Sequence, residues 1–215
     1  MFQELLESLE ELKKTREIEN MKARTPETKA KEQPQSGTHA ARLLGIVDLG
    51  HQPGFVWDGK PVPSEYKLEF TYELVNHLME DGRPFVVSEQ LTNKNWEDAK
   101  TGRASTLTSR AKSLCPDTYK EAVTAIETML GKACMVSVKL NDKGYAKVSG
   151  QAAVGSVPFG MEVPELTNKP YIFDMNDPDM ELYESFPDFK KERITSALNF
   201  DESELAKRLA EGDQY

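Results

Sequence analysis

Five separated stretches of the chain have the length and apolar spacing of β-strands. The most regular is 66–74, YKLEFTYEL, in which large apolar and polar residues alternate without a break. The other four are 42–50, 84–91, 133–140 and 145–153. Turn residues separate them, with Glu80-Asp81-Gly82 after the second stretch and Asn141 to Gly144 between the last two. The pattern predicts a mainly β protein with an antiparallel sheet.

Helical spacing appears in three other parts of the chain. Two helices are expected between the third and fourth strands, at 104–113 and 119–130. The N-terminus carries one amphipathic helix, 2–19, followed by a Pro-containing polar stretch. Beyond residue 155 prolines recur, and the pattern predicts one short strand, 171–173, with helices at about 179–186, 188–198 and 201–211.

The order strand-strand-strand-helix-strand-strand is that of the OB-fold, a five-stranded, partly open barrel. SH3-like barrels and unrelated α+β domains show similar patterns and stay open as alternatives. We therefore predict an amphipathic helix at 1–20, a flexible linker at 21–39, an OB-fold domain at 40–155 and an acidic, helix-containing C-terminal region at 156–215.

Charge is unevenly distributed along the 215 residues, whose net charge is −9. Residues 161–215 hold 14 acidic and 6 basic side chains, a balance of −8. The stretch 100–150 holds nine basic and four acidic side chains, a balance of +5. A basic middle beside an acidic C-terminal third is compatible with a polyanionic ligand, and the acidic part would screen the basic surface or recruit a partner.

Several classes of function lack their sequence signatures. The chain has no phosphate-binding loop, no G-x-S-x-G, no H-E-x-x-H and no C-x-x-C motif, and its two cysteines and three histidines form no spaced ligand set. Neither a signal peptide nor an apolar run of about 18 residues is present. We expect a non-enzymatic, cytoplasmic protein without metal or cofactor and without a membrane segment.

A groove for unpaired nucleic acid needs cations along the phosphates and flat rings on which bases stack. In an OB-fold the ligand crosses strands two and three, between the loops after strands one and four, here 51–65 and 141–144. The candidate contact residues combine both chemistries. They are Phe55, Trp57, Tyr72, Lys94, Trp96, Lys100, Arg103, Arg110, Lys112, Lys139, Lys143, Tyr145 and Lys147.

Each candidate also has an ordinary structural interpretation. Tyr72 shares one strand face with Phe70 and Leu74 and is more easily explained as a core residue. Trp96 could close one end of the barrel instead of stacking on a base. The lysines of the last hairpin, taken singly, fit a solvated surface, and only their clustering favours binding.

Several stretches together resemble phage-encoded single-stranded DNA-binding proteins of the OB-fold type, a small family in tailed bacteriophages. They are LLGIVDLG (43–50), KLEFTYEL (67–74), RPFVVSE (83–89), GKACMVSV (131–138) and KPYIFD (169–174). The similarity covers about residues 40–200, in order. A four-cysteine zinc ribbon, found in some relatives of the barrel, has no counterpart here.

This resemblance implies sequence-independent binding and protection of single-stranded DNA during replication or recombination in the infected bacterial host. It also implies recruitment of phage or host replication proteins through the acidic C-terminal region. The alternative is a non-enzymatic interaction module of a phage assembly that binds protein through the N-terminal helix.

Overall fold

One long strand organises the sheet and pairs with three others. The structure, a computed structural model, describes residues 32–156 and 163–212. The predicted helix 2–19 and most of the predicted linker 21–39 lie outside these residues. The strands are β1 (Gly37–Gln52), β2 (Phe55–Trp57), β3 (Lys60–Val62), β4 (Glu65–Leu78), β5 (Pro84–Thr92), β6 (Ala133–Leu140), β7 (Ala146–Ala153) and β8 (Tyr171–Phe173). The helices are α2 (Thr106–Leu114), α3 (Tyr119–Ala122), α4 (Met180–Ser185), α5 (Asp188–Thr195) and α6 (Glu204–Gly212), with 3-10 turns η1 (Ile126–Met129), η2 (Val154–Ser156) and η3 (Phe200–Glu202).

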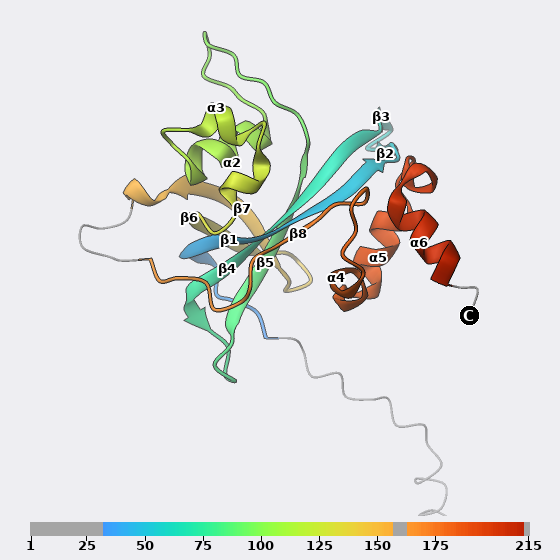
Figure 1. The fold of residues 1–215 in the computed structure, drawn as a ribbon. Coiled ribbons are helices and arrows are strands. Elements are labelled where there is room, and N and C mark those ends of the chain that lie inside the picture. The colour runs from blue at the N-terminus through green and yellow to red at the C-terminus, as the bar shows by residue number, and fades with distance from the viewer. Residues whose placement is uncertain (1–31, 157–162, 213–215) are drawn as a thin grey trace, which may run out of the picture. The chain divides into compact units, whose positions relative to one another are not determined.

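The main sheet has the hydrogen-bonded order β5-β4-β1-β6-β7, and all of these pairs are antiparallel. β1 is long enough to pair with β6 over its first half and, in parallel, with β8 over residues 45–47. β5 and β7 approach each other without pairing, so the sheet is open there. The expectation of a mainly β protein is confirmed (Figure 1).

Two hydrophobic cores lie on opposite faces of this sheet. The first packs the inward side chains of β4, among them Leu68, Phe70 and Leu74, against α2, α3 and η1. The second packs Val47 and Leu49 of β1 against β8 and helices α4 to α6. Because β1 contributes to both cores, its residues 40–50 are almost continuously buried instead of alternating.

The C-terminal region is built onto the sheet and does not form a separate tail. Residues from 33 onward make up one compact unit, so the boundary predicted at 155/156 does not divide two bodies. β8 adds to β1, and Leu205 of α6 is fully buried in the second core. An acidic, helix-containing region was expected here, and apolar residues that recur through 173–205 anchor its helices to the sheet.

The predicted linker also ends earlier than residue 39. Pro34 is buried, and the Gln33 side chain accepts a hydrogen bond from the Ala146 backbone N–H at 2.8 Å. β1 begins at Gly37, whose neighbours pair with β6. Polar composition alone suggested a flexible segment, but hydrogen bonds to the sheet hold Gln33 and residues 37–39.

The helix predicted over 119–130 is divided into α3 and η1. The hydroxyls of Thr124 and Thr128 donate to backbone carbonyls three residues earlier, at Glu121 and Ala125. Such local bonds compete with continued helix formation. None of the helices that the described residues form is long and apolar enough to cross a membrane.

Candidate nucleic-acid interface

The first candidate element is the β2–β3 hairpin, which replaces the loop expected over 51–65. Trp57 pairs with Lys60 across a two-residue turn in which Asp58 and Gly59 both have positive φ, 49° and 71°. This is the backbone that two-residue hairpins of primed type require, and Asp-Gly is its preferred sequence. The Asp-Gly dipeptide was therefore the signal from which this hairpin could have been predicted.

Trp57 and Phe55 stand on the same face of this hairpin, because side chains two residues apart in a strand share a face. Trp57 is 72% exposed and Phe55 is also exposed. Lys60, opposite Trp57, lies on that face as well and forms no ion pair within the described chain. Lys60 was missed as a candidate because its position depends on the register of the hairpin.

The second candidate element is the β6–β7 hairpin. Lys139 and Lys147 are directly opposite each other, so their ammonium groups project from one face. Like charges in such a pair are destabilising, and no described carboxylate compensates either one. Both lysines line a hollow of about 390 Å³ together with Asn141 and Ser149. Uncompensated positive charge around a hollow suits an anionic ligand.

The turn of this hairpin adds an exposed ring and a third cation. The Asn141 side-chain oxygen accepts hydrogen bonds from the backbone N–H groups of Lys143 and Tyr145, both at 3.0 Å. This fixes the turn locally. Tyr145 is exposed, and Lys143 makes no ion pair in the part of the chain that is described.

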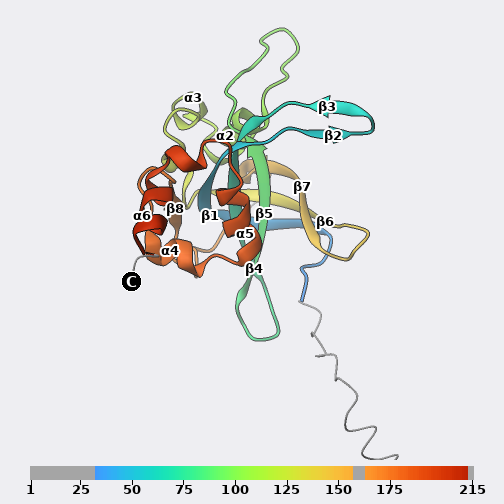
Figure 2. The same ribbon diagram turned by 90° about the vertical axis from the view of Figure 1, so that its right-hand side faces the viewer.

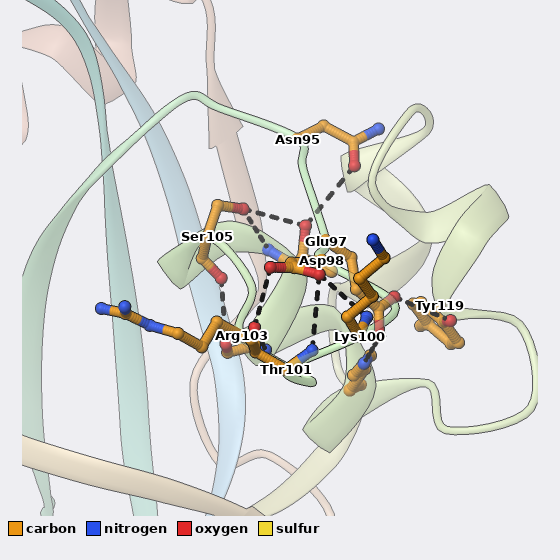
Figure 3. A network of polar contacts seen from close by, with 11 residues as sticks. Asn95, Glu97, Asp98, Lys100, Thr101, Arg103, Ser105 and Tyr119 are labelled. Carbon is orange, nitrogen blue, oxygen red and sulfur yellow. Dashed lines mark hydrogen bonds and ion pairs between the residues drawn. The ribbon is translucent and has the colours of Figure 1, made fainter.

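The third candidate element is the loop 93–105 between β5 and α2, shown in Figure 3. Asp98 orders its tip by accepting hydrogen bonds from the Lys100 backbone at 2.8 Å and from the Thr101 hydroxyl at 2.9 Å. The Arg103 side chain extends away from this network (Figure 3). Trp96, Lys100 and Arg103 are all exposed, and neither cation has an ion-pair partner among the residues described.

These three elements lie around the outer surface of β5. Figure 2 shows the β2–β3 hairpin and the tip of the β6–β7 hairpin projecting on the same side, with β5 facing the viewer beside them. The loop 93–105 stands at the same end of the sheet as β2–β3 in both views. Val86, Ser88 and Gln90, the outward side chains of β5, are exposed.

Two predicted contact residues lie instead on the inner face of the sheet, where Tyr72 is fully buried and Arg110 is largely covered and paired with Glu89. Tyr72 is fully buried, and its hydroxyl donates to Glu89 Oε1 at 2.9 Å. Arg110 of α2 forms two hydrogen bonds to the Glu89 carboxylate, both 2.7 Å. Burial raises the pKa of Tyr72 well above its ordinary value, so the phenol stays neutral. The inward alternation of β4 and β5 buries Tyr72, and the position of α2 on the inner face pairs Arg110 with Glu89.

Two further candidates are at the surface but are neutralised by carboxylates. Lys94 Nζ lies 2.7 Å from Glu65 Oε1. Lys112 Nζ bonds to Glu97 Oε1 and sits 5.0 Å from the centre of the Tyr119 ring. The pKa of Glu97 is lowered by this bond to Lys112. Neither lysine is an uncompensated cation, because each has an acidic neighbour brought in by the tertiary structure.

The outward face of β4 is covered by the C-terminal region. Glu69 pairs with Lys190 of α5, with 2.6 Å between Oε1 and Nζ, and both side chains are at least 90% buried. Glu73 accepts hydrogen bonds from the backbone N–H groups of Thr167 and Asn168, at 2.6 and 3.0 Å, and from the Asn168 side chain at 2.6 Å. These contacts leave β5, and not β4, as the accessible strand of the pair.

Within residues 32–156 and 163–212, no group of three or more His, Cys, Asp or Glu side chains is arranged to hold a metal ion. Cys134 is fully buried in the core, and this burial raises the pKa of its thiol to about 12. Comparisons with protein-family models, curated proteins and solved structures give no match for this chain. Its function is therefore inferred from geometry and chemistry.

Proposed function

We propose that this protein binds single-stranded DNA, without sequence preference, along the outer surface of β5 between the β2–β3 hairpin, the β6–β7 hairpin and the loop 93–105. The contacts would be phosphate to lysine or arginine and base to aromatic ring. Of the residues predicted from sequence, the surface would use Phe55, Trp57, Trp96, Lys100, Arg103, Lys139, Lys143, Tyr145 and Lys147.

The strand order supports assignment of the sheet to the OB-fold. Taking β1, β4, β5, β6 and β7 as strands one to five, the observed order is 3-2-1-4-5. This is the neighbour order of an OB barrel opened between strands three and five. The helical segment lies between strands three and four, as in that fold. In this assignment β2–β3 and the 141–144 turn are the two loops that flank an OB ligand site.

The site we propose is displaced from the usual OB position. That position spans strands two and three, but here the outward carboxylates of strand two are buried beneath the C-terminal region. A strand of DNA would therefore lie over β5 and toward β7, where the lysines of the β6–β7 hairpin are.

One observation carries the proposal: three exposed rings stand beside cations that no described carboxylate neutralises. Trp57 has Lys60 across its hairpin, Trp96 shares a loop with Lys100 and Arg103, and Tyr145 lies between Lys143 and Lys147. Stacking on unpaired bases is an interaction that uses exposed rings and adjacent cations together.

Fluorescence anisotropy with a labelled dT oligonucleotide tests the proposal, with a duplex of the same length as the competing ligand. Trp57→Ala should weaken dT binding by about 1–3 kcal/mol, roughly 5- to 150-fold, because one stacked base is lost. For the unmodified protein, the logarithm of the binding constant should fall linearly with the logarithm of the salt concentration. This salt slope should be about −0.7 for each phosphate that the protein neutralises.

Phe189→Ala is the matched control. Phe189 is 68% exposed on α5 and belongs to none of the three elements of the proposed surface. It should leave dT affinity unchanged. Equal losses from both variants, or stronger binding of the duplex than of dT, would contradict the proposal.

The sequence resemblance leads us to propose a biological setting as well. The protein would coat single-stranded intermediates of phage DNA replication or recombination in the cytoplasm of an infected bacterium. Replication proteins of phage or host would bind the acidic exterior of its C-terminal region. Pull-down of single-stranded DNA from infected cells with the tagged protein, before and after nuclease treatment, tests this setting.

A further inference from the structure

Glu65 lies on the outward face of β4, next to the proposed surface, and pairs with two lysines. One carboxylate oxygen is 2.7 Å from Lys94 Nζ, and the other is 2.7 Å from Lys67 Nζ. The second oxygen also accepts a hydrogen bond from the Thr92 hydroxyl at 2.9 Å. A single negative charge thus holds two lysines, and the cluster carries a net charge of +1.

The cluster lies where the proposed DNA path meets the loop 93–105. Glu65 is the first residue of β4, a short way after the end of β3 at Val62, and Lys94 lies just beyond the end of β5 at Thr92. Lys67 and Thr92 are register partners across β4 and β5. Lys94 is more than half exposed even though it is paired, so a ligand could reach its ammonium group.

The arrangement of donors around Glu65 is one that a phosphate would also satisfy. Two ammonium groups and a hydroxyl converge on two anionic oxygens. A phosphodiester likewise presents two anionic oxygens and accepts charge-assisted hydrogen bonds from lysine. The carboxylate therefore occupies a position that has the chemistry of a phosphate site.

We propose that Glu65 holds this position in the free protein and that a backbone phosphate of the bound strand displaces it from Lys94 and Lys67. The proposal rests on the proposed function, since it concerns the same surface. Binding then exchanges one set of ion pairs for another, so Glu65 limits affinity and lowers its dependence on salt.

Protonation cannot release the two lysines at ordinary pH. The hydrogen bonds from Lys67, Lys94 and Thr92 lower the pKa of Glu65 to about 2, from an ordinary value of 4.5. The carboxylate is charged at any pH near neutrality, and only a competing anion can replace it. Affinity for DNA should therefore show no step between pH 5 and 7 that depends on Glu65.

The test compares Glu65→Gln with Asp81→Asn. Both changes remove one negative charge and release a basic group, because Asp81 pairs with Arg83 at 2.6 Å. That pair lies in the β4–β5 turn, at the opposite end of the sheet from the loop 93–105 (Figures 1 and 2). Each variant and the unmodified protein are titrated with a dT oligonucleotide and with inorganic polyphosphate over a salt series.

Glu65→Gln should bind dT about two- to tenfold more tightly, the range expected for removing competition by surface ion pairs. Its salt slope should be steeper by about 0.7–1.4 log units, for one or two additional phosphates. Asp81→Asn should resemble the unmodified protein. Adding Lys94→Gln to Glu65→Gln should cancel most of the gain, which a purely structural role of Glu65 would not predict.

The outcomes separate this inference from the proposed function. If no variant binds dT but Glu65→Gln binds polyphosphate more tightly than Asp81→Asn does, the DNA proposal fails and the displacement of Glu65 stands. If the unmodified protein binds dT and Glu65→Gln matches it in affinity and salt slope, the displacement is overturned while DNA binding stands. Equal gains in Glu65→Gln and Asp81→Asn would also overturn it, because they would reflect net charge alone.

Discussion

Arg110→Met should lower the free energy of unfolding by about 3–5 kcal/mol, because it leaves the Glu89 carboxylate charged inside the protein without its partner. The two side chains are only 14% and 11% exposed and are joined by two hydrogen bonds of 2.7 Å. Tyr72 would remain as the one donor to Glu89 shown by the structure, and a phenol cannot neutralise a carboxylate. Urea denaturation followed by circular dichroism measures the loss.

This variant also separates a structural arginine from a binding one. Arg103→Met removes an exposed guanidinium of the loop 93–105 and should change stability by less than about 0.5 kcal/mol. It should instead reduce the salt slope of dT binding by about 0.7. Folded Arg110→Met protein should keep the original slope. If Arg110→Met weakened DNA binding and left stability intact, Arg110 would be a surface contact and its place in the interior would be wrong.

The second large effect is expected at the contact between α5 and β4. Lys190→Met leaves Glu69 buried and unpaired beneath the C-terminal region and should cost about 3–5 kcal/mol. Because this ion pair links a residue of the sheet to the acidic third of the chain, the loss should appear as one cooperative transition of the whole unit. Urea unfolding followed by circular dichroism and by Trp fluorescence should give coincident curves.

Two further variants complete the experiment. Glu69→Met combined with Lys190→Met should recover most of the lost stability, since apolar residues of similar volume often replace a buried pair at no cost. Lys191→Met, in the neighbouring position, breaks an ion pair with Glu184, which is 65% exposed, and should cost less than about 1 kcal/mol. Similar losses at positions 190 and 191 would show that the Lys190–Glu69 pair is not specifically buried.

Local pattern was sufficient to predict most of the strands. The stretches at 84–91, 133–140 and 171–173 match the observed β5, β6 and β8 to within one residue. The assignment of Phe70 and Leu74 to the core follows from alternation along one strand and is confirmed. Trp57 was assigned to a loop and to the contact surface, and it is exposed on the β2–β3 hairpin.

The contact surface was less predictable, because it depends on which charges meet. Nothing near Arg110 in the sequence indicates Glu89, and Lys94 is separated from Glu65 by the whole of β4 and β5. Three of the thirteen predicted contact residues, Lys94, Arg110 and Lys112, are paired with carboxylates for this reason, whereas Tyr72 is buried because it faces the core. Lys60, by contrast, gains its place beside Trp57 only through the register of a hairpin.

The sequence by itself determined where most strands and the 141–144 turn form, because alternation and turn residues act over a few residues. The tertiary structure alone decided that solvent reaches the outward face of β5 and not that of β4. Segment 163–173 and helix α5 return from far along the chain to cover β4, so solvent reaches β5 instead. Contacts between residues about 100 positions apart depend on packing and pairing of the complete fold, and local periodicity carries no information about them.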